Sequence, residues 1–200
     1  MLKNFTKIEI ATAIAVLFHT IGLVGLLYFD KTFFLTATAF NLLLSFTLLL
    51  WTQPQKNLYF FLFFAACFFI GIAVEIIGIN TAILFGDYTY GNVLGYKFKN
   101  VPILIGINWF IIIYCCGISI HTLLTKAINK LAAATRKEPS ALKALSVIVD
   151  GATMAVFFDW LMEPVAVKLG YWMWNGDGSI PMLNYICWFG VSLILLAIFH

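Results

Sequence analysis

Three acidic residues lie in stretches of this chain that are otherwise strongly apolar. Glu75 belongs to "GIAVEIIG", and Asp159 and Glu163 belong to "FFDWLMEP". An unpaired carboxylate is costly in an apolar medium, and no lysine or arginine lies in the outer half of any apolar stretch to pair with these acids. Carboxyl groups in such surroundings can give and take protons, so we interpret the three acids as functional rather than structural residues.

A fourth acid, Asp150, is interpreted differently. It lies nine residues before Asp159, which on an ideal helix is about the opposite side. We expect a structural role, with Asp150 facing the helix bundle and paired with Lys143 or with hydroxyl groups of the fourth apolar stretch. Pro164 follows Glu163 directly and is predicted to end that helix.

The acids belong to an internal repeat. "EIIGINTAILFGDYTYGN" from Glu75 matches "DWLMEPVAVKLGYWMWNG" from Asp159: in each, a glycine follows the acid by eleven residues and aromatic residues follow it by thirteen and fifteen. The next apolar stretches, "VPILIGINWF" and "IPMLNYICWF", also match, with a Trp-Phe pair seven residues after the proline. We interpret residues of about 58–124 and 141–199 as two copies of one helical hairpin.

Parallel copies related by an axis along the membrane normal would place Glu75 and Asp159 at one depth, within one or two turns of the outer helix ends. We therefore expect the two acids to face a shared cavity, joined by Glu163 one turn after Asp159. Gly71 and Gly78 share the helical face of Glu75 and leave room there for another helix or a substrate.

Aromatic residues dominate the two loops that follow the acids. Tyr88, Tyr90, Trp172 and Trp174 have two interpretations, an aromatic belt at the membrane surface or a roof over the acids whose π faces stabilise a positive centre. The first loop, "GDYTYGNVLGYKFKN", is predicted to form a short hairpin.

The composition indicates that the chain lies in a membrane. With 62% hydrophobic and 10% charged residues and a mean hydropathy of +0.98, the chain is predicted to be an all-α integral membrane protein, one polytopic domain over residues 1–200. Six stretches are long enough to cross about 30 Å of hydrocarbon. They are Ile8–Tyr28, Thr32–Trp51, Leu58–Gly78, Val101–Leu124, Ala141–Leu161 and Pro181–Phe199.

The basic residues indicate the orientation. Eight lie on the side shared by the N-terminus and the even-numbered loops: Lys3, Lys7, Lys56, Lys126, Lys130, Arg136, Lys137 and Lys143. Lys31, Lys97, Lys99 and Lys168 lie opposite. The positive-inside rule then predicts a multi-pass protein of the cell (inner) membrane with both termini cytoplasmic. Because topology accounts for the net charge of +3, no nucleic-acid partner is expected.

The histidines do not indicate a metal site. His19, His121 and His200 lie on different segments, without the spacing of a di-iron or zinc motif. We expect no metal.

At the residues of the repeat, the chain resembles the membrane family of carotenoid biosynthesis that includes the CruF-type carotenoid 1,2-hydratases. The resemblance covers about residues 70 to 190. It rests on the acid followed by Gly-x-aromatic-x-aromatic, on Val-Pro in "VPILIGINW", and on Asp-x-x-x-acid-Pro in "DWLMEP".

This resemblance implies hydration of the terminal C1–C2 double bond of an acyclic carotenoid, which makes the enzyme a hydro-lyase that needs no cofactor. A carboxyl kept protonated by an apolar site protonates one alkene carbon, and a second acid directs water to the tertiary cation. The catalytic candidates are Glu75, Asp159 and Glu163. The substrate-binding candidates are Tyr88, Tyr90, Asn108, Trp109, Trp172, Trp174 and Asn184, of which the two asparagines would hold the water. The expected partners are the carotenoid, water, membrane lipid and other enzymes of the pathway.

Two other functions stay open from the sequence. One is cyclisation of the end group, in which an internal double bond captures the cation. The other is a small proton-coupled transporter or lipophile-binding protein whose acids bind a proton or a cation. For an enzyme we expect phenylalanines of "YFFLFFAACFF" to line a tunnel or lateral opening from the acids to the bilayer.

Overall fold

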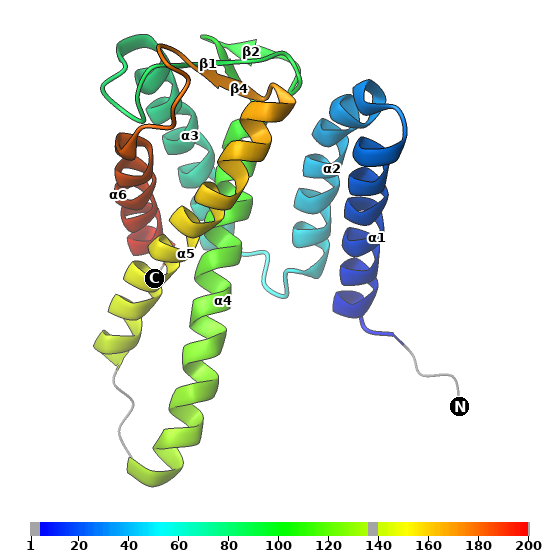
Figure 1. Ribbon diagram of the computed structural model, residues 1–200. Helices are drawn as coiled ribbons and strands as arrows, with labels where there is room; N and C mark the ends of the chain where they lie inside the picture. The colour runs from blue at the N-terminus through cyan, green and yellow to red at the C-terminus, as the bar shows by residue number, and fades with distance from the viewer. Residues whose placement is uncertain (1–4, 136–139, 200) are drawn as a thin grey trace.

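The computed structural model describes residues 5–135 and 140–199, and six helices account for most of them (Figure 1). Lys3, Arg136, Lys137 and His200, used above, lie outside the described residues. The helices are α1 (Lys7–Tyr28), α2 (Lys31–Thr52), α3 (Leu58–Thr81), α4 (Leu104–Thr135), α5 (Ser140–Leu169) and α6 (Met182–Phe199). All six are long and apolar enough to span a membrane, which confirms the predicted fold class.

The first three helices start at polar caps that the sequence places directly before an apolar run. The side chains of Thr6, Asp30 and Asn57 each accept a hydrogen bond from the backbone N–H three residues later. Asp30 also follows α1 almost at once, so the chain reverses between α1 and α2 in a tight turn. These caps fix where each of the three helices begins.

Helix α5 corrects one prediction, because it continues through Pro164 to Leu169. A proline inside a helix removes one backbone hydrogen bond. Ending the helix inside the apolar layer would leave several backbone groups without partners, which costs more in hydrocarbon. The helix therefore continues, and it ends about two turns beyond the predicted end at Leu161. Helix α4 also extends past its predicted end, Leu124, to Thr135.

Four short strands cover one end of the bundle, here called the strand end (Figure 1). β1 (Tyr88–Tyr90) pairs antiparallel with β4 (Trp172–Trp174), so the predicted hairpin within the first loop is wrong for this segment. A hairpin does form later in that loop, between β2 (Lys97–Phe98) and β3 (Val101–Pro102). Its two turn residues, Lys99 and Asn100, both have positive φ, as a two-residue hairpin turn requires.

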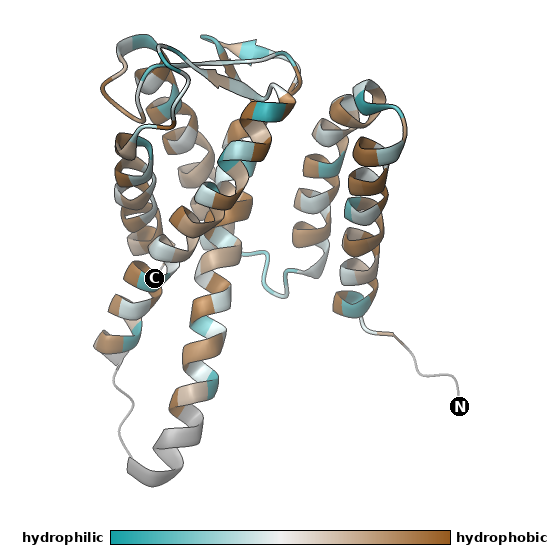
Figure 2. Cartoon of the chain, viewed as in Figure 1, coloured by the Kyte–Doolittle hydropathy of each residue, from teal (hydrophilic) through white to brown (hydrophobic). Residues whose placement is uncertain are grey.

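Helices α3 to α6 pack together beneath the strands, and the α1–α2 hairpin stands beside them (Figure 1). Helix α2 contacts α4, and α1 packs on α2. Figure 2 shows that apolar residues dominate all six helices, with hydrophilic residues more frequent in the loops and strands of the strand end. The site is built where those loops fold back over α3 and α5.

Candidate functional site

Glu75 is buried near the strand end of α3 and is surrounded by hydrogen-bond donors. Its Oε2 accepts from the hydroxyl groups of Tyr88 and Tyr90, the latter at 2.9 Å. Its Oε1 accepts from the indole Nε1 of Trp109 on α4, at 3.0 Å. Both oxygens are thus occupied, which explains how a carboxyl group is accommodated in "GIAVEIIG".

Two glycines of α3 make these bonds sterically possible. A Cβ at Gly71 would lie 2.6 Å from the side chain of Trp109, and one at Gly78 would lie 3.2 Å from the hydroxyl of Tyr88. The predicted room beside Glu75 therefore exists. It is filled by the protein's own donors, which lets them approach the carboxyl group closely.

The other two acids lie on successive turns of α5 and share one partner. Asn184 of α6 donates from Nδ2 to Asp159 Oδ2 at 2.7 Å and to Glu163 Oε1 at 3.3 Å. Glu163 Oε2 also accepts from the indole Nε1 atoms of Trp172 and Trp174, both at 3.0 Å. An indole can only donate, so this oxygen must accept both bonds.

One carboxyl oxygen of this cluster differs from the rest. Asp159 is fully buried, and within the described part of the chain its Oδ1 has no hydrogen-bond partner. Every other oxygen of Glu75, Asp159 and Glu163 accepts at least one hydrogen bond. A buried polar atom without a partner is uncommon and invites a functional explanation.

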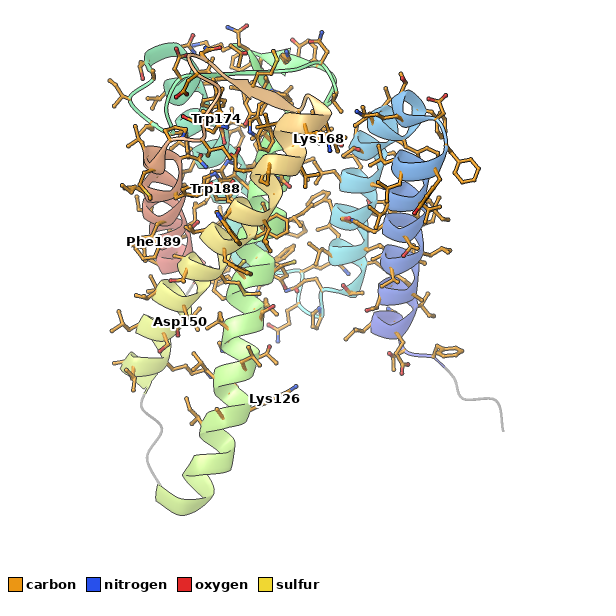
Figure 3. The ribbon with its side chains drawn as sticks, in the orientation of Figure 1. Lys126, Asp150, Lys168, Trp174, Trp188 and Phe189 are labelled. Carbon is orange, nitrogen blue, oxygen red and sulfur yellow. The ribbon has the colours of Figure 1, made fainter. Side chains whose placement is uncertain are left out.

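The two loops meet over the acids in a symmetric register. Tyr88 lies opposite Trp174, and Tyr90 lies opposite Trp172. In the repeat, Tyr88 corresponds to Trp172 and Tyr90 to Trp174, so replacing each residue by its counterpart gives the same two pairs. Below it, Trp109 of α4 stacks on Trp188 of α6, with ring centroids 4.0 Å apart and planes inclined by 18°. Figure 3 shows Trp174 and Trp188 toward the strand end, where α6 and the loops approach α5. Both arrangements support our interpretation of the two hairpins as copies of one unit.

The three acids line one small pocket of about 30 Å³, which is room for about one water molecule. All ten of the predicted site residues line it, and Asn108 lies half-buried at its edge. The sequence missed four further lining residues: Phe85, Ile105, Met162 and Trp188. The described lining residues include no lysine, arginine or histidine. Three carboxyl groups and several aromatic rings without a basic residue suit a positive centre.

The tyrosines of β1 contribute neutral donors. Burial, followed by the nearby carboxyl of Glu75, raises the pKa of the Tyr88 hydroxyl, and the same causes raise the pKa of Tyr90. Both phenols therefore keep their protons and can hold Glu75 in place.

A second, larger cavity of about 450 Å³ adjoins the acid pocket. Its lining is almost entirely apolar and comes from α2, α4, α5 and the loops. The prediction that phenylalanines of "YFFLFFAACFF" line such an opening is wrong. Phe60, Phe63 and Phe64 pack instead against Phe110 of α4 in an aromatic core, because the helix face that carries Glu75 turns them toward the bundle. Phe60 and Phe63 border a separate cavity away from the acids.

Asp150 lies on α5 far from the acid pocket, toward the opposite end of the bundle (Figure 3). Its predicted separation from the acid cluster is confirmed, whereas its predicted bundle-facing placement is wrong, because Asp150 is exposed. Gly151 takes the packed position beside it, against Leu196 of α6. His19 is also exposed and bonds locally to the backbone oxygen of Ala15, at 2.8 Å.

The fold and the site together define a helical membrane protein with a buried acidic pocket next to an apolar cavity. The chain belongs to the carotenoid biosynthesis protein family, whose family model matches residues 31–200. This match is longer than the resemblance seen in the sequence and includes all of α2. Searches of curated proteins and of solved structures found no significant match.

Proposed function

We propose that this protein is a carotenoid hydratase, which adds water across the terminal C1–C2 double bond of an acyclic carotenoid end group. Membership of a carotenoid biosynthesis family gives the substrate class. The observation that carries the reaction type is the free Oδ1 of Asp159 inside a pocket whose other carboxyl oxygens are all occupied.

In this mechanism Asp159 is the proton donor. The π electrons of the alkene take the proton from Oδ1 and form a C–H bond at C2, which leaves a tertiary cation at C1. Water then forms a C–O bond at C1 and returns its surplus proton to the carboxylate, so the cycle consumes the alkene and one water molecule only. General acid catalysis of this kind contributes about 10²- to 10⁴-fold in rate.

The other two acids have an electrostatic role in the proposal. Glu75 and Glu163 each accept three hydrogen bonds, and indoles supply three of these six. Such donors favour the ionised carboxylate. Fixed carboxylates beside C1 stabilise the developing cation without having to reorganise. Asn184 bridges Asp159 and Glu163, and Asn108 lies where it can hold the incoming water.

The dimensions of the two cavities favour hydration over the alternatives. The acid pocket has space for a water molecule, whereas a folded end group about to cyclise needs more room. The adjoining space is large and apolar, as a polyene requires and as a water-connected transport pore does not.

The test is conversion of an acyclic carotenoid by membranes of a heterologous host that express the protein. Hydration increases the product mass by one water molecule, cyclisation leaves the mass unchanged, and a transporter or binding protein leaves the pigment itself unchanged. Product analysis by mass spectrometry distinguishes the three, and an unchanged pigment with abundant, inserted protein would refute the proposal.

A further inference from the structure

The large apolar cavity beside the acids is bounded by three helices. Thr38 and Leu42 of α2 form one wall, and a stripe of α5 forms the other, with Ile105 and Asn108 of α4 between them. The α5 stripe consists of Phe158, Leu161, Met162, Val165, Ala166 and Leu169. These positions repeat at helical spacing over about 16 Å of helix, next to the stripe that carries Asp159 and Glu163.

One side of this cavity is closed by protein and the other is open. Leu94, Ile105 and Ala166 are buried at its base. Phe158, Leu161 and Val165 are half exposed, at 46%, 50% and 55%. These three lie on a span that the bilayer surrounds, so the exposed side opens sideways into lipid. At the strand end, the hydroxyl groups of Thr38 and Tyr171 are hydrogen-bonded at 2.5 Å and close the cavity toward the loops.

The cavity leads directly to the acids. Ile105, Asn108, Met162 and Trp172 line both the apolar cavity and the acid pocket. A chain lying in the cavity would thus reach the carboxyl groups with its end, past Asn108 and Met162. Trp172 also donates to Glu163, so the wall of the apolar cavity is tied to the acid cluster.

We propose that this groove between α2, α4 and α5 binds the polyene chain of the substrate, which enters sideways from the bilayer and presents only its terminal double bond to the acids. That the bound molecule is a polyene rests on the proposed function. It gives α2 a part in the substrate site, in agreement with a family match that begins at the first residue of α2. The length of polyene that the groove does not cover stays in the lipid.

The experiment fills the groove without touching the acids. Leu161→Trp and Val165→Trp each add volume to the wall of the groove, at half-exposed positions where a larger side chain does not overpack the protein core. Leu62→Trp is the matched control, because Leu62 is 55% exposed and lines a cavity of about 390 Å³ that shares no residue with the groove. The readouts are the carotenoid that copurifies with the protein and the conversion rates of two substrates. One is a full-length acyclic carotenoid, and the other is a short acyclic terpene with the same end group.

The groove variants are expected to lose about tenfold in copurified pigment and in conversion of the full-length carotenoid, a change of about 1.4 kcal/mol. Conversion of the short terpene, and all properties of Leu62→Trp, should stay near wild type. Wild-type pigment content and conversion in both groove variants would overturn the groove while leaving hydration intact. Loss of pigment in the groove variants of a protein that hydrates neither substrate would support the groove and refute the proposed function instead.

Discussion

The acids at equivalent positions of the two hairpins, Glu75 and Asp159, differ in the hydrogen bonds that they accept. In the first, Glu75 takes donors from both aromatic residues of β1 and from Trp109, so its oxygens are fully occupied. In the second, the aromatic residues of β4 donate to Glu163, one turn after the repeat-equivalent acid. Among the described residues, Asp159, which occupies that equivalent position, has Asn184 as its one hydrogen-bond partner, and its Oδ1 has none.

We propose that this difference separates two chemical roles within one pocket. A carboxylate that is held by several donors is a fixed charge, whereas a carboxyl oxygen without a partner can exchange a proton. Glu163, which has no counterpart in the first hairpin, accepts the hydrogen bonds of Trp172 and Trp174, so these two residues do not bond to Asp159. The asymmetry between the hairpins is therefore the basis for assigning proton donation to Asp159 and cation stabilisation to Glu75 and Glu163.

The largest expected effect is at the acids themselves. Asp159→Asn and Glu75→Gln should each reduce the hydration rate by about 10² or more, and the double variant should be little worse than either single one, because the acids act as a unit. Both proteins should insert and retain pigment. Steady-state conversion in isolated membranes measures this. Full additivity of the two losses would show that the acids act independently.

A smaller effect is expected when the donors are removed from one acid at a time. Tyr88→Phe removes a bond to Glu75, and Trp174→Phe removes a bond to Glu163. Each acid keeps two other donors, so we expect a loss near the lower end of what a hydrogen bond to a charged group contributes, about 1.5 kcal/mol or about tenfold in rate. If the fixed-charge role is right, maximal rate falls while the apparent affinity for carotenoid does not. A change confined to affinity would instead make these residues substrate contacts.

Gly71→Ala tests whether the close approach of Trp109 matters. The new Cβ would lie 2.6 Å from the indole side chain, so Trp109 must move away from Glu75. We expect a fewfold loss of activity and a lower melting temperature in detergent, because overpacking lowers the free energy of unfolding by about 1–3 kcal/mol. Gly190→Ala on α6 is the control, because no atom of the described residues lies within 4 Å of a Cβ placed at Gly190, and alanine favours a helix. Equal activity and stability of the two variants would show that the close approach of Trp109 at Gly71 is not needed.

The smallest effect is expected at Asp150. It is exposed, far from the acid pocket, and absent from its lining. Asp150→Asn should therefore leave the rate and the retained pigment within experimental error of wild type. A loss comparable to that of Asp159→Asn, in a protein that is normally inserted, would show that the acid cluster does not contain the whole proton path.

Much of the helical fold follows from the sequence because hydrocarbon permits few alternatives. Apolar runs of membrane length must become helices, and five of the predicted helix starts lie within one residue of the observed ones. The exception is α4, whose predicted start at Val101 fell on β3. The ends of α4 and α5 were harder to predict, since the polar residues of α4 after Leu124 continue the helix and Pro164 does not stop α5.

Most of the residues that line the acid pocket could also be predicted from the sequence, through the matched spacing of acids and aromatic residues in the two hairpins. The partners within it were not. Repeat spacing pairs Trp172 and Trp174 with Asp159, whereas both donate to Glu163. Such a shift by one helical turn depends on how β1 and β4 pair, which involves residues more than 80 positions apart. An apolar opening beside the acids was expected, but the walls of the proposed groove were not predicted, because the residues of α2 and α5 that form them have no feature in the sequence that distinguishes them from other apolar residues of a membrane span.

The central claim is that Asp159 protonates the alkene and water captures the cation, and isotope labelling tests it most directly. Wild-type protein and Asp159→Asn are incubated with an acyclic carotenoid in water labelled with deuterium and heavy oxygen, and the product is analysed by mass spectrometry. The wild-type product is expected to carry one deuterium at C2 and a labelled hydroxyl at C1, and Asp159→Asn is expected to form almost none of it. An unlabelled hydroxyl group, or the doubly labelled product formed by Asp159→Asn at the wild-type rate, would contradict it.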